Sequence, residues 1–111
     1  MKNIANESLL TLFGYSINDA SKTHIKRVIH NTKGFERIKK HIINLNDTLK
    51  PYRSHITLSN SKDYLKIKIQ SISSMTQLSH INEIIHNWAA KYKIELQKVK
   101  NKDTYYIVGV K

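Results

Sequence analysis

The sequence predicts an α+β fold in which N-terminal helices precede a hairpin–helix–hairpin unit, giving a four-stranded, mainly antiparallel sheet with helices on one face. Two periodicities lead to this prediction. Apolar residues recur every three to four positions over 1–50 and 74–92, as in amphipathic helices. Over 55–70 the period changes to two, which indicates a β-hairpin, and a second hairpin is predicted over 94–110 from two runs that flank a turn.

The chain has 111 residues, which is enough for one domain and too few for two. We therefore expect a single domain over 1–111, with a helical part over 1–50 and a ββαββ part over 53–110. An apolar content of 40% supports an ordinary core, and the low Gly and Pro content argues against a linker. Because the chain has no cysteine, neither disulfides nor thiolate metal sites are expected.

The first two helices are predicted from their apolar faces and their ends. The first covers about 4–13 and ends at Gly14, which can adopt the left-handed conformation that closes a helix. The second covers about 19–31, with Ser16 or Asn18 as its N-cap. Both are expected to be amphipathic and to bury one side.

The third helix is predicted over about 35–50, after a break at 32–34 that contains glycine. It ends before Pro51, because the residue that precedes a proline disfavours the helical conformation. Its apolar seam has clean helical spacing and consists of Ile38, Ile42, Leu45 and Leu49.

The remaining elements follow from the change of period. The first hairpin turns at 60–63, between two strands with one apolar and one polar side. A capping box from Ser74 to Gln77 opens the fourth helix, which runs to about Tyr92. The last strand, 104–110, is apolar on both faces, so we expect it inside the sheet.

Positive charge is the strongest functional signal. Nineteen Lys and Arg stand against eight acids, a net charge of +11, and the sequence pI is about 9.9. A domain pI above about 9 is typical of nucleic-acid binding. Residues 22–53 hold nine basic and two acidic residues, so the field concentrates there.

We therefore expect a small nucleic-acid-binding protein that contacts mainly the phosphate backbone of DNA or RNA. Lysine outnumbers arginine, which suits phosphates better than base edges. If about six phosphates of duplex DNA are neutralised, the log–log salt slope should be near −5. The candidate binding residues are Lys22, Lys26, Arg27, Lys33, Arg37, Lys39, Lys40, Asn44, Arg53, Lys66 and Lys68.

The second and third helices, joined by a short break, are compatible with a helix-turn-helix, and the hairpin with the wing of a winged-helix regulator. Asn46 could then reach base edges with the cations of the third helix. Against this, the second helix is long for the motif, and His30 and Lys33 stand where small or apolar residues would help tight packing. A basic face of another geometry and two ordinary solvated helices remain as alternatives.

The polar side of the first hairpin is a second candidate surface. Tyr64, Lys66, Lys68 and Gln70 alternate outward, and such lysines and aromatics can bind phosphates and stack on bases. Exposed lysines on an edge strand also have an ordinary role, because they discourage edge-to-edge aggregation.

No constellation of residues indicates catalysis or metal binding. His55-Ile56-Thr57 resembles one half of the paired motif of two-histidine phosphoesterases, but no second copy lies on a strand. The other histidines lack zinc-ligand spacing, and Trp88 falls in an apolar seam, which favours a core position. We expect a binding protein with no cofactor and no metal, and a small nuclease is the third function class.

The remaining partner and compartment assignments are expectations of the same kind. The longest apolar run is about four residues, 105–108, so no membrane partner is expected, and the chain is interpreted as cytoplasmic. The alternative to nucleic acid is an acidic protein partner, which the basic face would dock or inhibit. A homodimer through the fourth helix is left open.

Overall fold

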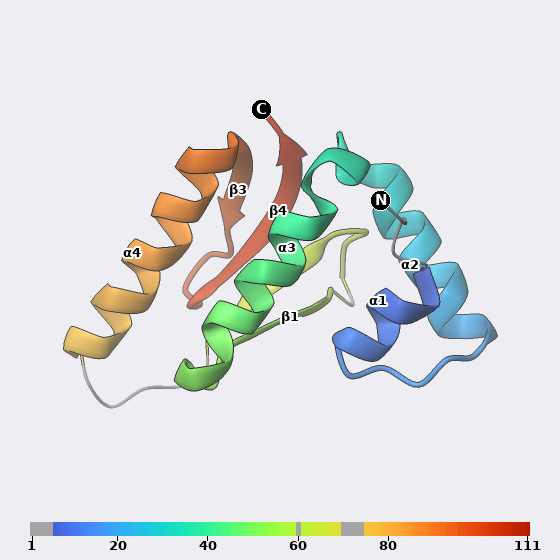
Figure 1. Ribbon diagram of the computed structural model, residues 1–111, viewed down its shortest axis with the longest axis horizontal. Helices are drawn as coiled ribbons and strands as arrows, with labels where there is room; N and C mark the ends of the chain where they lie inside the picture. Colours follow the sequence, from blue (N-terminus) through green and yellow to red (C-terminus); the bar gives the residue numbers. More distant parts are fainter. Residues whose placement is uncertain (1–5, 60, 70–74) are drawn as a thin grey trace.

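The computed structural model describes residues 6–59, 61–69 and 75–111, and has the predicted α+β class and element order (Figure 1). Its helices are α1 (Asn6–Leu12), α2 (Asp19–Asn31), α3 (Phe35–Leu49) and α4 (Met75–Tyr92), with a 3₁₀ turn, η1 (Lys50–Tyr52), after α3. Its strands are β1 (His55–Leu58), β2 (Leu65–Lys68), β3 (Ile94–Lys98) and β4 (Thr104–Val110). No described helix combines the length and the apolar character needed to cross a bilayer.

The ends of the helices follow from local chemistry. Asn18 is the N-cap of α2: its side-chain oxygen accepts from Ser21 N at 2.8 Å, and Ser21 Oγ accepts from Asn18 N at 3.0 Å. Gly14, after α1, has the predicted left-handed conformation, with φ of 84°. The capping box predicted for α4 starts at Ser74, which lies outside the described residues.

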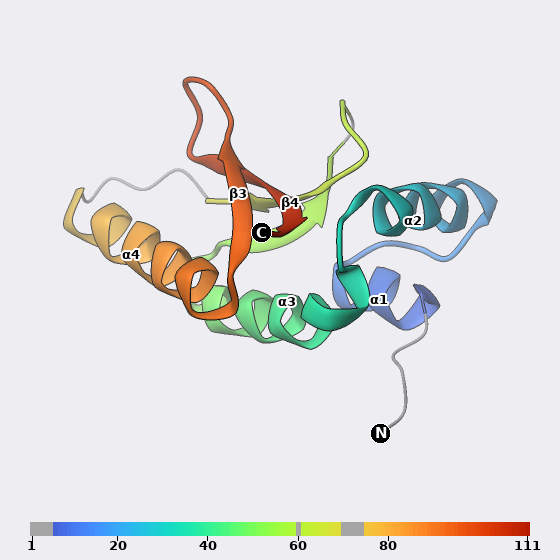
Figure 2. The ribbon, with the colours of Figure 1, turned by 90° about the horizontal axis from the view of Figure 1, so that it is seen from above.

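The four strands form one antiparallel sheet in the order β1-β2-β4-β3. The prediction that the last strand is internal is confirmed, because β4 lies between β2 and β3. Figure 2 shows α3 and α4 along one side of this sheet, and the side chains between the two layers form the core. The opposite side of the sheet is not covered by α3 or α4.

α2 lies outside the layer formed by α3 and α4. Its main contacts are with α1 and β1, and Figure 2 shows it displaced to one side of the sheet. Two bonds tie it to the β1–β2 turn: Arg27 Nε lies 3.4 Å from Asp63 Oδ1, and Asn31 Nδ2 donates to the Asp63 carbonyl at 2.9 Å. The tight packing of α2 on α3 that a helix-turn-helix requires is therefore replaced by packing on other elements.

The segment between α2 and α3 crosses the end of β4 at backbone distance. Lys33 forms a parallel bridge with Gly109, and Val110 N donates to the Lys33 carbonyl at 2.8 Å. Gly109 has φ of 141°, and a Cβ there would lie 2.6 Å from both the N and the O of Lys33. Gly34 has φ of 69°, and a Cβ there would lie 2.5 Å from Val110 Cγ2. The crossing therefore requires glycine on both chain segments.

Replacing Gly109 with alanine should destabilise the protein by at least about 2 kcal/mol, because the new methyl group meets backbone atoms and φ is unfavourable for an L-residue. Gly14→Ala is the matched control. It also has positive φ but nothing within 4 Å of the added Cβ, so a loss of about 1 kcal/mol is expected. Urea denaturation measures both variants, and equal losses would contradict a steric role for the crossing.

The outer edge of β1 is capped by two side chains. Ile56 N donates to Asn46 Oδ1 at 2.9 Å, and Leu58 N donates to the Tyr15 hydroxyl at 2.9 Å. These N–H groups face away from β2 and would otherwise be open for pairing with another chain. The prediction that Asn46 could reach a nucleic acid is therefore wrong, because its side chain is 5% exposed and engaged with β1.

Asn46→Ala should cost about 1–3 kcal/mol, because the Ile56 N–H would be left buried without an acceptor. Asn44→Ala, two residues earlier on the exposed side of α3, should leave the unfolding free energy within about 0.5 kcal/mol of wild type. Thermal denaturation of the pair separates the two. A stable Asn46→Ala variant would show that β1 does not need this cap.

Candidate nucleic-acid interface

The cations predicted to bind nucleic acid do not form one face of the molecule. Some lie near the α2–α3 junction, and others lie on the open face of the sheet, which is the side opposite α3 and α4. The rest lie on the outer side of α3 and at the two ends of the helical part.

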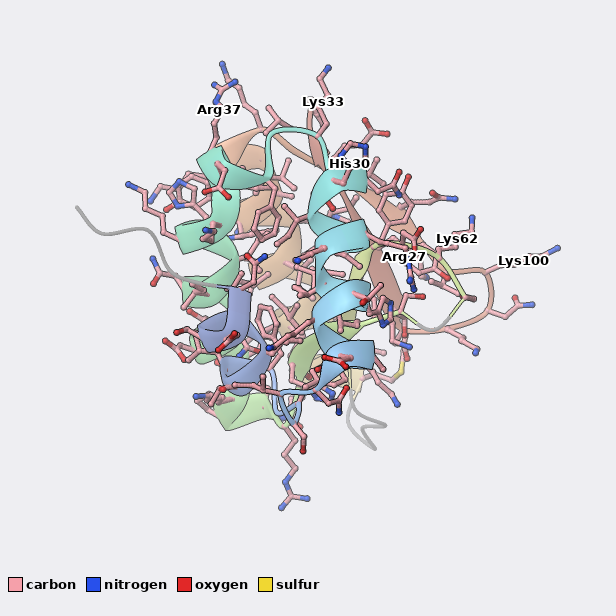
Figure 3. The ribbon with its side chains drawn as sticks, turned by 90° about the vertical axis from the view of Figure 1, so that its right-hand side faces the viewer. Arg27, His30, Lys33, Arg37, Lys62 and Lys100 are labelled. Carbon is pink, nitrogen blue, oxygen red and sulfur yellow. The ribbon has the colours of Figure 1, made fainter. Side chains whose placement is uncertain are left out.

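Several exposed basic side chains that are visible together from one side form what we call the basic rim. Figure 3 shows it running from the first turn of α3 across the C-terminal half of α2 to the two hairpin turns. Its members are Arg27, His30, Lys33, Arg37, Lys62 and Lys100, all exposed. Arg27, Lys33 and Arg37 were among the binding residues predicted from sequence, whereas Lys62 was not.

The crossing of Lys33 over β4 explains why cations converge at one end of the rim. α3 begins two residues after Lys33, so Arg37 emerges in its first turn. Lys111 N donates to the Lys93 carbonyl at 2.9 Å, beside the bond from Val110 N to the Lys33 carbonyl. Exposed Lys93 and Lys111 thus join Lys33 and Arg37 at the C-terminal end of β4. No pattern in the sequence indicated these two lysines, because only the tertiary structure brings them there.

Most cations of the basic rim have no carboxylate partner among the described residues. Within the part of the chain that the structure describes, no carboxylate lies within 4.0 Å of the charged groups of Lys33, Arg37, Lys62 or Lys100. Arg27 is the exception, since it shares its charge with Asp63. These cations are consequently available to an external anion.

Two other predicted residues are engaged elsewhere. Lys39 is 7% exposed, with its ammonium 3.2 Å from Glu36 Oε2 and 5.8 Å from the centroid of the Phe35 ring. Its predicted role as an exposed contact is therefore wrong. Lys22 Nζ lies 3.5 Å from Glu7 Oε1 and lines a hollow with Lys26 between α1 and α2.

Lys66 and Lys68 lie on the open face of the sheet. The register aligns His55, Lys68 and Thr104 in one cross-strand row, and Lys66 with Tyr106 in the next. Burial, and then the charges of Lys68 and Lys66, lower the pKa of His55, which therefore stays neutral at pH 7. Figure 2 shows the two hairpin turns projecting to this side of the sheet, away from α3 and α4.

The tyrosines of this face are partly covered. The Tyr64 and Tyr106 ring centroids are 5.9 Å apart, and Lys62 Nζ lies 5.5 Å from the centroid of the Tyr106 ring. Hydrogen bonds from Ser61 and Ser59 lower the pKa of Tyr106. The groups that this face presents to a ligand are therefore lysine side chains and not uncovered aromatic rings. Gln70, the fourth residue predicted for this face, lies outside the described residues.

The outer side of α3 connects the rim with a groove. Arg37, Lys40 and Asn44 are exposed at positions i, i+3 and i+7, so they follow one side of the helix. Asn44 lines a groove between α3 and α4. Arg53 lies beyond the other end of α3, after η1, and belongs to none of these surfaces.

The described residues contain no group of three or more His, Asp or Glu side chains arranged to hold a metal ion. Trp88 is 9% exposed within the core, as its seam predicted, and its Nε1 donates to the His41 carbonyl at 2.9 Å. The chain matches no protein-family model, no curated protein and no solved structure.

Proposed function

We propose that this protein binds nucleic acid and holds the phosphate backbone on the basic rim. The observation that carries the proposal is the gathering of exposed Lys33, Arg37, Lys62 and Lys100 on one side, without a carboxylate partner among the described residues (Figure 3). Such cations attract polyanions and release condensed counterions when they bind.

The overall charge supports the same proposal. A net charge of +11 on a chain of 111 residues opposes compaction through self-repulsion. A bound polyanion would relieve this repulsion. Fields between exposed charges extend only about 8 Å at physiological salt, so cations that lie together on the rim act on one ligand more strongly than scattered ones.

Charge reversal at the C-terminal end of β4 should abolish most binding. We expect the double variant Lys33→Glu/Arg37→Glu to bind labelled duplex DNA, single-stranded DNA and RNA at least about tenfold more weakly at low salt. Fluorescence anisotropy measures the affinities, and circular dichroism should show an unchanged fold, since both side chains are exposed.

Lys50→Glu/Arg53→Glu is the matched control, because it changes the net charge equally at the opposite end of α3. Its affinity should fall less than about threefold, as for a distant exposed charge. Equal losses in the two double variants would overturn the rim and leave only a net-charge effect. If no probe binds to wild type, the nucleic-acid proposal fails, and an acidic protein is the next partner to test.

The salt dependence gives an independent measure of the contacts. With four to five rim cations each neutralising a phosphate, duplex binding should show a log–log salt slope of about −4. The slope should shrink in magnitude by about 2 in the Lys33→Glu/Arg37→Glu variant, one unit for each lost phosphate contact. Anisotropy titrations at several salt concentrations determine it, and a wild-type slope near zero would contradict backbone binding.

A further inference from the structure

The groove between α3 and α4 has a volume of about 270 Å³, and the basic rim does not include it. Its apolar wall includes Ile84, Trp88 and Tyr92, all from α4. Asn44, Asn87 and Lys91 supply polar groups. An apolar cleft with a few hydrogen-bonding groups is the usual form of a small-ligand site, and this volume is just below the usual range of about 300–1,000 Å³.

The aromatic part of the groove is held rigidly. The hydrogen bond from Trp88 Nε1 to the His41 carbonyl fixes the indole, and the Tyr92 ring stacks on His41 with centroids 3.6 Å apart. Burial, and then the charges of Lys40 and Lys91, lower the pKa of His41, so this ring stays neutral at pH 7. A preorganised wall loses little entropy when a flat ring packs against it.

The polar groups define the chemistry of the ligand. Asn44 and Asn87 are exposed on the two helices, and within the described residues no hydrogen bond engages either side-chain amide. An amide offers a donor beside an acceptor, the pattern that pairs with the edge of a nucleobase. Among the described residues that line the groove, Lys91 alone is charged, so the complementary ligand is anionic.

The groove also lies on a basic path from the rim. Arg37 belongs to the rim, Lys40 follows one turn later, and Asn44 opens the groove one turn beyond. From Arg37 to Asn44 the helix rises about 10 Å. Lys91 lines the groove itself, and Lys40 precedes Asn44 by one turn on the exposed side of α3. The charges of both lysines act on His41, whose ring stacks on Tyr92 of the groove wall.

We propose that the groove receives one unpaired base of a bound strand, with its phosphates on Lys40 and Lys91. This inference rests on the proposed nucleic-acid binding and refines it, because a base inside a duplex stack cannot enter such a groove without being flipped out. The protein should accordingly prefer single strands to duplexes. A free nucleotide has the same chemistry, so the test includes one.

Trp88 is the only tryptophan of the chain, so its emission reports on the groove directly. We would titrate the protein with a single-stranded oligonucleotide, the corresponding duplex and adenosine monophosphate, and follow emission and anisotropy together. The single strand should change Trp88 emission as it binds, whereas the duplex should bind to the rim with little change.

The matched variants are Asn44→Ala/Asn87→Ala in the groove and Gln97→Ala on β3, and all three positions are exposed amides. The groove variant should bind the single strand at least about fivefold more weakly, with duplex affinity unchanged, because one or two hydrogen bonds are lost. The Gln97→Ala control should match wild type. Unchanged melting temperatures would show that the fold is intact.

The outcomes separate the groove from the rim. Single-strand binding that leaves Trp88 emission unchanged, or equal affinities for the groove variant and wild type, would overturn the groove and leave the rim standing. If no strand binds, the rim proposal fails, and the mononucleotide decides the groove alone. A change in Trp88 emission with adenosine monophosphate that disappears in the groove variant would support a free-nucleotide site, and no change would overturn it.

Discussion

The arrangement of the molecule depends on the backbone contact between Lys33 and the end of β4. Gly109 makes it possible, because any side chain there would meet the Lys33 backbone at 2.6 Å. The contact holds the start of α3 over the sheet while α2 turns away to lie beside it (Figure 2). It also places Lys33 and Arg37 next to the last residue of β4, so one contact organises both the helical layer and the basic end of the molecule.

The β1 edge of the sheet and the face opposite α3 and α4 differ in what contacts them. At the β1 edge, Asn46 and Tyr15 accept from outward N–H groups, so the polar backbone there is satisfied within the chain. The face of the sheet opposite α3 and α4 is not covered by either helix, and Lys66 and Lys68 lie on it. Asn46 and Tyr15 thus satisfy backbone N–H groups at the β1 edge. The uncovered face of the sheet instead presents the lysines of β2 to solvent.

The helical seams, the hairpins and the internal position of β4 could be predicted because they follow from periodicity, and Ile38, Ile42, Leu45 and Leu49 are buried as their spacing requires. Lys39 shows the limit of this reasoning. Its ammonium lies over the ring of Phe35, four residues earlier, and the residue is buried although it is charged. Asn46 was similarly misjudged, because its partner is the Ile56 N–H on a strand ten residues away.

The sequence by itself determined the α+β class, the order of the elements and the strong positive charge, since these depend on composition and on local repeats. The tertiary structure decided where α2 lies, which cations are paired or buried, and that Lys33, Arg37, Lys93 and Lys111 meet at one end. The physical reason is that helix and strand periods are local properties of the chain. Convergence of residues 33 and 111 depends instead on backbone contacts between distant segments, and these require glycine at two particular positions.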